Sequence, residues 1–413
     1  MTTTELDVAW VRTQFPAFSD PQSAGWAHFE NAGGSYVPKQ VIDILTSFFT
    51  STKVQPYVAA GPSQRGGAAM DRAYELMPAT FNAAPDQVHF GPSTSQNTYV
   101  LAHAVRSALQ AGDEVVVTNQ DHEANIGVWR RLADVGAVIK EWEVDADTGL
   151  LDVDDLAALL SEKTRLVCVT HASNITAAVN PIAEIAEMVH SAGGWLVVDG
   201  VAHAPHAAID VMELGCDAYV YSTYKTFGPH LGMMFTSDDF RDAIANEGHY
   251  FNAAKPTSRL TPAGPDHASV AATAGIIDYY QAVHDHHFPT RPANTKDLIS
   301  DVFELFAAHE ERLMTPILEL LSTKDVRVIG IEEPDHDRRA PTIAFHSARA
   351  MADDVCRGLG DQKIACAHGN FYAKRLVEAL GIDPDIGVAR LSLVHYNDMD
   401  EVARAVAALD RLL

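Results

Sequence analysis

The chain has little positive charge and little cysteine for its length. Of its 413 residues, 30 are Lys or Arg and 55 are Asp or Glu, so the net charge is −25 with histidine neutral. A surface this negative repels nucleic-acid phosphates and anionic lipid headgroups, and we therefore expect neither nucleic acid nor membrane as a partner. Four cysteines without a C-x-x-C pair argue against a disulfide framework or a zinc site, and no metal is expected.

Long apolar runs and targeting signals are also missing. No stretch approaches the roughly 18 apolar residues that a membrane-spanning helix needs. The N-terminus, MTTTELDVAW, has neither a basic nor an apolar signal region, so a cytoplasmic protein is expected. The nucleotide-binding motifs G-x-G-x-x-G and G-x-x-x-x-G-K-[ST] do not follow the first strand candidate. What the chain does have is 47% hydrophobic residues, enough to bury a large core in two packed domains.

Short β-branched runs alternate with helical patterns in the first two thirds of the chain. The strand candidates are 87–90, 113–119, 137–144, 164–173, 195–200, 217–222 and 232–237. Several are apolar throughout, which is typical of strands that helices cover on both faces. The alternation predicts an α/β fold, in which a large domain is built on a mainly parallel, doubly wound sheet.

The pattern changes near residue 289 to that of a smaller α+β domain. It predicts a long amphipathic helix over 292–322, strands at 326–333 and 340–347, and a last helix with Asn397 as its N-cap. The expected division of the chain has three parts: an N-terminal segment, 1–22, that packs on the small domain or on a partner subunit, the large domain, 23–288, and the small domain, 289–413.

Two reactive side chains follow neighbouring strand candidates. Asp199 ends an apolar run, and Lys225 follows the next run, between Tyr224 and Phe227. Taken singly, Asp199 is as simply explained as a helix cap, and Lys225 as a solvated surface group. Ligands of open α/β sheets bind at the carboxyl ends of the strands, and there this pair suits pyridoxal phosphate. The lysine would hold the cofactor as a Schiff base, and the carboxylate would keep its pyridine nitrogen protonated.

The cofactor's phosphate needs hydroxyls and backbone N–H groups at a helix N-terminus. Ser93, Thr94 and Ser95 begin a helical pattern and are the candidates for this role, although a simple N-cap explains them equally well. Ser222, just before Lys225, is expected to add a further bond to the phosphate.

The cofactor ring needs a flat group on its open face and partners at its edge. His122 is the candidate for stacking on the ring, although a lone histidine in such a loop is more often a surface group. Asn174 follows another strand and is the candidate donor to the ring's 3-hydroxyl. His203 is expected to add a bond to the ring.

From FENAGGSYVPKQVID to RLSLVHYNDMDEV, the chain resembles the class V aminotransferase family on its cysteine desulfurase branch. The resemblance implies the type I fold of pyridoxal-phosphate enzymes, an α-amino acid substrate and a homodimer with active sites near the subunit interface. It assigns the Schiff-base role to Lys225, the pyridine-nitrogen role to Asp199 and ring stacking to His122. It also implies that Asn174 lies near the substrate and that Arg390 binds the substrate's α-carboxylate, for which a planar guanidinium is suited.

The chain departs from cysteine desulfurases at several positions. Tyr372 stands where those enzymes carry the cysteine that accepts sulfur, and it is expected in the substrate pocket instead. The nearest thiol, Cys366, follows an apolar Ile-Ala pair and is expected to be structural. Ala202 replaces a glutamine, and Gly264 replaces a threonine that reaches the phosphate of the neighbouring subunit. The chain thus resembles a desulfurase-like subgroup that lacks the catalytic cysteine.

These residues leave more than one function open. Lyase chemistry on an α-amino acid, such as β-elimination with C–S cleavage and no persulfide relay, is the first expectation. An aminotransferase is the second, and an epimerase with Tyr372 or His368 as a second acid is also compatible. A non-catalytic scaffold on a degenerate enzyme fold is a different class, against which the joint presence of Lys225, Asp199 and His122 argues.

Overall fold

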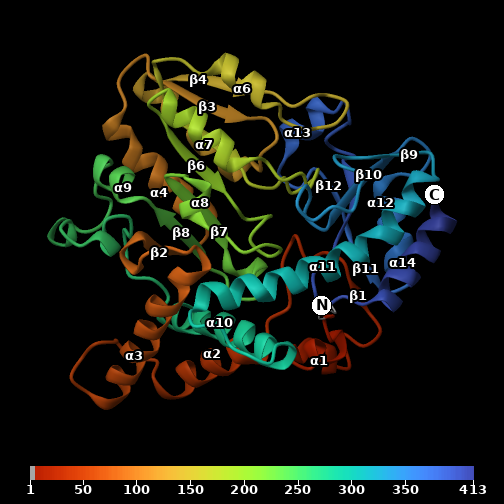
Figure 1. Cartoon of the computed structure of the whole chain (residues 1–413), viewed down its shortest axis with the longest axis horizontal. Coiled ribbons are helices and arrows are strands. Elements are labelled where there is room, and N and C mark those ends of the chain that lie inside the picture. Colours follow the sequence, from red (N-terminus) through yellow and green to blue (C-terminus); the bar gives the residue numbers. More distant parts are fainter. Residues whose placement is uncertain (1–4) are drawn as a thin grey trace.

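The large sheet forms from the seven runs expected to be strands. The structure, a computed structural model, describes residues 5–413 (Figure 1). The strands of this sheet are β2 (Val88–Gly91), β3 (Glu114–Thr118), β4 (Val138–Trp142), β5 (Thr164–Thr170), β6 (Trp195–Asp199), β7 (Ala218–Ser222) and β8 (Gly232–Thr236). Their order is β2-β8-β7-β6-β5-β3-β4. The strand β8 pairs antiparallel with both β2 and β7, and all other neighbouring pairs are parallel. The prediction of an α/β fold with a mainly parallel sheet is confirmed.

Helices cover both faces of this sheet because successive strand residues point in opposite directions. Val115 and Val117 pack on the side of α4 (Thr94–Val105), whereas Val116 packs on the side of α7 (Ile182–Ser191) and α10 (His267–His287). All three valines are fully buried. This burial on both faces explains why the strands read as continuous apolar runs.

A second, smaller sheet is antiparallel. Its strands, in spatial order, are β12 (Ala367–Gly369), β13 (Val388–Ser392), β10 (Thr342–Ser347) and β9 (Val326–Val328). The helices α12 (Ala352–Gly360) and α14 (Met399–Leu412) pack on it. The N-terminal strand β1 (Ala27–His28) pairs in parallel with β11 (Ile364–Ala365) beside this sheet.

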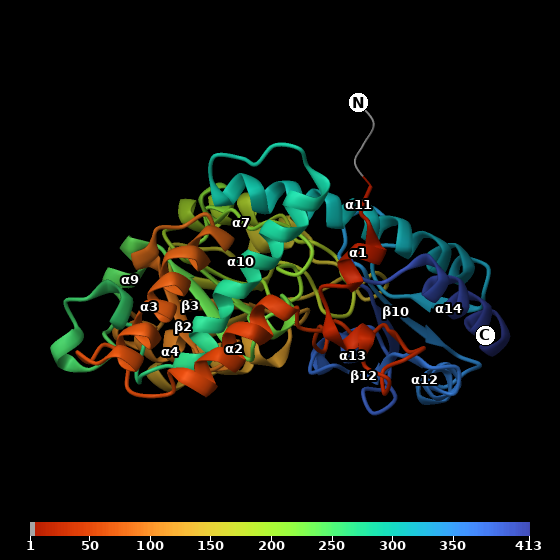
Figure 2. The same cartoon turned by 90° about the horizontal axis from the view of Figure 1, so that it is seen from below.

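One long helix, α11 (Thr295–Ser322), belongs to both cores (Figure 2). Its first half, up to Phe306, packs with the helices over the large sheet, and its second half, from Leu313, packs on the small sheet. The division of the chain at residues 22 and 288 stays a prediction. The last helix, α14, begins one residue later than expected: Asp398, rather than Asn397, caps it through the backbone N–H of Glu401.

The N-terminal segment contacts both parts of the molecule. Phe15 packs edge-on against Phe227 and Tyr396, and Arg12 donates to Glu401 of α14 at 2.5 Å. The remaining helices are α1 (Val8–Arg12), α2 (Lys39–Ser51), α3 (Gly61–Leu76), α5 (Gly127–Arg130), α6 (Val153–Leu159), α8 (Val211–Leu214), α9 (Asp238–Ala243) and α13 (Lys374–Ala379). Over residues 5–413, no helix has both the length and the apolarity to cross a membrane.

Candidate active site

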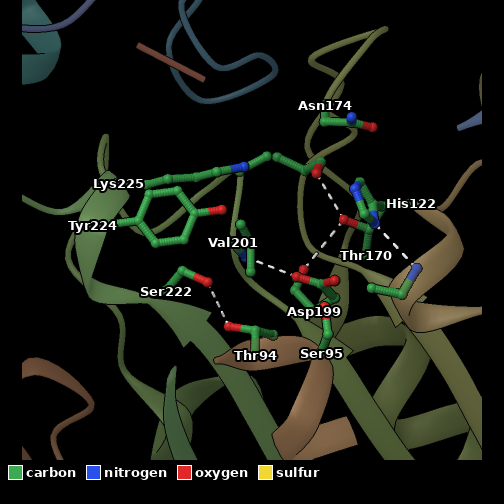
Figure 3. A pocket seen from close by; sticks show the side chains of 13 residues that line it. Thr94, Ser95, His122, Thr170, Asn174, Asp199, Val201, Ser222, Tyr224 and Lys225 are labelled. Carbon is green, nitrogen blue, oxygen red and sulfur yellow. Dashed lines mark hydrogen bonds between the residues drawn. The ribbon is translucent and has the colours of Figure 1, made fainter. Parts of the chain in front are cut away.

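A cavity lies where the central parallel strands end and α4 begins (Figure 3). Its lining residues are Thr94, Ser95, His122, Ala124, Thr170, Ala172, Asn174, Asp199, Val201, Ala202, Ser222, Tyr224 and Lys225. Among the site residues expected from the sequence, this lining therefore includes Thr94, Ser95, His122, Asn174, Asp199, Ser222 and Lys225.

Asp199 and Lys225 share this cavity because they end neighbouring strands. Asp199 is the last residue of β6, which pairs in parallel with β7, and Lys225 lies in the short turn after β7. Burial lowers the pKa of Lys225 to about 8, with Arg390 adding to the effect. Burial raises the pKa of Asp199 to about 6, although a hydrogen bond from the N–H of Val201 and the charge of Lys225 oppose the rise. A lysine held this way is largely protonated at neutral pH but gives up its proton far more readily than a surface lysine.

Hydroxyl groups gather at the N-terminus of α4. The hydroxyls of Thr94 and Ser222 lie 2.7 Å apart, and Ser95 lines the same end of the cavity (Figure 3). Ser93 instead caps the helix by accepting from the N–H of Gln96. For this residue the structure agrees with the alternative of a simple N-cap. The first-turn N–H groups have no partner within a helix, and together with the hydroxyls they make a suitable anion cradle.

His122 begins a short turn at the opposite side of the cavity. Its Nδ1 accepts from the N–H of Ala124 at 3.1 Å, which orients the ring. Burial, followed by the charges of Lys225 and Arg390, lowers the pKa of His122 to about 4, so the ring is neutral at physiological pH. A neutral, flat ring is what stacking on an aromatic cofactor requires.

Asp121 supports this turn, a role that the sequence did not single out. It is fully buried and accepts from Asn125 Nδ2 at 2.7 Å and from the hydroxyl of Thr118. Burial raises the pKa of Asp121 to about 7, and the nearby charge of Asp199 contributes to the rise. Asp121 therefore fixes the position of the His122 turn without lining the cavity.

Arg390 lies behind the cavity, on β13 of the small sheet. It is buried, its Nη1 donates to the carbonyl of Asn174 at 3.0 Å, and its guanidinium lies 3.7 Å from the ring centre of Phe371. Its Nη2 donates to Oε1 of Glu30 at 2.7 Å. Neither Phe371 nor Glu30 was predicted, because both reach Arg390 from distant parts of the chain.

Asn174, the candidate donor to the ring hydroxyl, lines the cavity and also bonds to the loop that contacts Arg390. Its Nδ2 already donates to the carbonyl of Phe371 at 2.9 Å, and its Oδ1 is buried without a partner among the described residues. An asparagine amide carries two N–H groups, and the bond to Phe371 uses one of them. Asn174 therefore stays a candidate partner for a ring hydroxyl or for a substrate.

The loop 369–372 contacts both Arg390 and the turn that begins at His122. Phe371 and Tyr372 both have left-handed backbone angles, with φ of 49° and 60°. The carbonyl of Tyr372 accepts from the N–H of Glu123 at 2.7 Å. The ring centre of Tyr372 lies 5.2 Å from the ring centre of His122. Tyr372 is 74% exposed and borders the cavity rather than lining it.

His203 does not point where the sequence suggested. Its ring stacks on His171 at 3.7 Å and lines a separate small cavity beside Glu310, while its neighbour Ala202 lines the main one. The turn after β6 causes this, since the N–H of His203 bonds back to the carbonyl of Gly200 and directs the side chain away. A direct bond from His203 to a cofactor ring does not fit this geometry.

The remaining reactive candidates lie outside the cavity. Cys366 lies beside Cys356 in the small unit, and no cysteine of the described chain lines the cavity. His368 pairs with Asp353 at 3.3 Å, and His230 stacks on Tyr224. The described residues contain no cluster of His, Cys, Asp or Glu suited to a metal ion.

Fold and pocket together define an α/β protein with a desolvated lysine and an acid at adjacent strand ends, beside a hydroxyl-rich helix N-terminus. The chain belongs to the class-V aminotransferase family, whose model matches residues 27–275 and 299–405. Members of this family typically use pyridoxal phosphate.

Two relatives match almost the whole chain. It is 36% identical to an aminotransferase-like protein of Gibberella zeae, over all of both chains. It is 31% identical to a cysteine desulfurase-like protein of Aspergillus flavus, over 99% of this chain and 91% of that protein.

Solved structures show the same fold at lower identity. The cysteine desulfurase of Thermococcus onnurineus, solved in its apo form, aligns with a TM-score of 0.84 at 20% identity, over 100% of this chain and 99% of that one. The cysteine desulfurase of Escherichia coli aligns with a TM-score of 0.81 at 23% identity, over 98% of both chains.

Proposed function

We propose that this protein is a pyridoxal-phosphate enzyme that carries out lyase chemistry on an α-amino acid, by β-elimination of a group such as a thiol. The observation that carries the proposal is the meeting of Lys225 and Asp199 in one cavity with the hydroxyl cradle at the start of α4. When bound, the cofactor would supply an electron sink for the pair of electrons left by a removed proton.

The residues present fit this cofactor. The Nζ atom of Lys225 has no hydrogen-bond or ion-pair partner among residues 5–413, so it is available to an aldehyde. Asp199 suits a pyridine nitrogen, since a buried carboxylate is stabilised by a positively charged N–H. Thr94, Ser95 and Ser222 suit the phosphate. Arg390 would hold the substrate's α-carboxylate, with Asn174 beside it.

In this scheme Lys225 also moves the proton. Its amine would remove the α-proton of the bound amino acid, and a pKa lowered toward neutrality suits that task. The bond from the β-carbon to its leaving group then breaks, and the leaving group departs with the electron pair. The released three-carbon product reacts with water to give pyruvate and ammonium, so no external oxidant or amino acceptor is consumed.

The absence of a persulfide relay is part of the proposal. The loop that precedes Arg390 places Tyr372 beside His122, and a phenol cannot accept a sulfur atom from the substrate. The thiol of Cys366 lies next to Cys356 rather than in the cavity. The hydrogen bond between the two thiols, followed by burial, raises the pKa of Cys366, which leaves it a poor nucleophile.

A panel of amino acids tests the reaction type. The holoenzyme is incubated with cysteine, cysteine conjugates, serine and alanine, and pyruvate, sulfide, ammonium and keto acids are measured. Pyruvate formed without an added keto acid supports elimination. If a keto acid appears only when an amino acceptor is added, the enzyme is an aminotransferase instead of a lyase. If the α-carbon is inverted and no pyruvate or keto acid forms, it is an epimerase.

The cofactor itself has a separate test. Purified protein titrated with pyridoxal phosphate should develop the visible absorbance of the lysine-linked cofactor. A colourless protein that does not bind the cofactor would favour the non-catalytic scaffold.

A further inference from the structure

Arg390, the proposed carboxylate-binding residue, already has a carboxylate bound to it. Nη2 of Arg390 donates to Oε1 of Glu30 at 2.7 Å. Glu30 lies on the extended segment that follows β1, and its backbone forms a parallel bridge with Ser392, two residues after Arg390 on β13. The pairing of these two segments brings the acid and the guanidinium together.

Both partners of this ion pair keep unused binding capacity. Glu30 Oε2 and Arg390 Nε are buried, and neither has a hydrogen-bond partner among the described residues. Asn174, whose backbone carbonyl accepts from Nη1 of Arg390, also has a buried Oδ1 without a partner among the described residues. Buried polar atoms are normally satisfied, so three such atoms around one guanidinium indicate a place that a ligand completes.

The charges constrain what that ligand does. The charges of Arg390 and Glu30 cancel each other, whereas the α-carboxylate of a substrate needs a positively charged partner. Were Glu30 to stay in place, a bound substrate would leave two carboxylates on one buried guanidinium, and an excess negative charge in a desolvated site is costly. The substrate carboxylate therefore has to replace Glu30.

Glu30 is the partner that has room to move. Its side chain is 25% exposed, against 3% for Arg390, which the ring of Phe371 also holds. Glu30 Oε1 lies over Gly33, where a Cβ would come within 2.7 Å of it. A residue with any side chain at position 33 would press on the carboxylate, so glycine lets Glu30 reach Arg390.

We propose that Glu30 is an exchangeable counter-ion of Arg390, a specificity-determining residue that occupies the guanidinium until a substrate carboxylate displaces it. The inference rests on the proposed role of Arg390. It implies that the site discriminates by charge: an α-carboxylate competes with Glu30, whereas an amine without a carboxylate leaves the Glu30–Arg390 pair intact. The apparent Kd of every monocarboxylate would then rise in inverse proportion to the fraction of molecules in which Arg390 is free of Glu30.

The test measures the affinity of propionate for the holoenzyme by calorimetric titration. Propionate carries the carboxylate but no amine, so binding does not depend on turnover. Glu30→Gln keeps the shape and an acceptor for Arg390 but removes the competing charge, and it should lower the Kd of propionate about tenfold. The affinity of propionamide, which has the same shape without the charge, should not change.

Two controls isolate the pair. Glu141 lies on the edge strand β4 and forms a similar ion pair with Arg130. Glu141→Gln should leave the affinity of propionate unchanged. In an Arg390→Gln background, Glu30→Gln should no longer have an effect, because the site for which the two carboxylates compete is gone.

The failure of this inference and that of the proposed function give different results. If Glu30→Gln leaves the Kd unchanged or raises it while Arg390→Gln raises it, Glu30 is not a competitor and only this inference is wrong. If Arg390→Gln has no effect on propionate, the carboxylate role of Arg390 fails, and the inference fails with it. Gly33→Ala, which displaces the carboxylate without removing it, should lower the Kd in the same direction and serves if Glu30→Gln does not fold.

Discussion

The two ends of the cavity are assembled in different ways. The end proposed for the cofactor comes from β6, β7 and α4, between residues 94 and 225, and its groups follow the strands of one sheet. The end proposed for the carboxylate brings Arg390 of β13 together with Glu30, Asn174 and Phe371. The first end needs only the correct sheet order, whereas the second needs the large and small units to meet.

This difference also appears in the electrostatics. At the cofactor end, the groups proposed to bind the phosphate are neutral hydroxyls and backbone N–H groups. The two charged groups there, Asp199 and Lys225, have pKa values shifted toward neutrality. The carboxylate end is an ion pair with unsatisfied atoms. This contrast fits the proposal that the chemistry takes place at the cofactor end and that substrates are selected at the carboxylate end.

The largest effect should come from removing the amine at the cofactor end. Lys225→Ala deletes both the anchor and the proton carrier, and turnover should fall by about 10³-fold or more. The visible absorbance of the lysine-linked cofactor should vanish as well. Lys374→Ala, an exposed lysine near Glu378, is the control. An unchanged spectrum in Lys225→Ala would show that another group binds the cofactor.

A substitution at the carboxylate end should separate binding from cofactor retention. Arg390→Gln removes a charge-assisted contact worth about 1.5–3 kcal/mol, so the KM for the amino acid should rise roughly 10- to 100-fold. The absorbance of the cofactor should stay, as it should in the surface control Arg357→Gln. Loss of the cofactor with an unchanged KM would reverse the roles of the two ends.

The shifted pKa of Lys225 predicts a stability effect in the cofactor-free protein. The folded pKa of about 8 lies below the ordinary value of 10.5, so between these pH values the unfolded chain binds the extra proton and stability rises with pH. At pH 7 the folded protein bears a cost of about 3 kcal/mol, which Lys225→Met should remove. Urea unfolding at pH 7 and at pH 10 should show the variant more stable at the lower pH and nearly equal at the higher. An equal gain at both pH values would attribute the effect to packing.

The smallest effects are expected at Cys366 and Tyr372, which lie at or near the position where cysteine desulfurases are expected to carry the sulfur-accepting cysteine. Cys366→Ser and Tyr372→Phe should each leave the rate of pyruvate formation within about twofold, since neither side chain lines the cavity. An inactive Cys366→Ser would restore the persulfide mechanism. A strong loss in Tyr372→Phe, with racemisation as the lost activity, would favour the epimerase.

The sequence predicted the cofactor end far better than the carboxylate end. Apolar runs locate the parallel strands, and Asp199 and Lys225 follow from where those strands stop. Their presence in one cavity agrees with the prediction, while their roles stay predictions. Glu30 and Phe371 had no comparable local signal, because their contacts with Arg390 depend on pairing across more than 300 residues and on a strained loop.

Errors in local detail had local causes. Asn397 was expected to cap the last helix, but its side chain is committed to the N–H of Val394 and to Glu401, which leaves the cap to Asp398. His203 was assigned to the ring because it neighbours Ala202, yet the turn at Gly200 sends consecutive side chains into different cavities. Sequence adjacency could not reveal either outcome.

The left-handed backbone at Phe371 and Tyr372 has a consequence for how this loop tolerates change. Glycine adopts such angles freely, whereas bulky side chains adopt them at a cost of about 1–3 kcal/mol each. Replacing either aromatic residue by glycine should therefore lower the conformational energy of the main chain, but it would remove the ring that contacts Arg390 or His122. Phe371 and Tyr372 adopt these angles although bulky residues disfavour them. We therefore expect that the conformation of this loop is determined by the contacts of the two rings with Arg390 and His122.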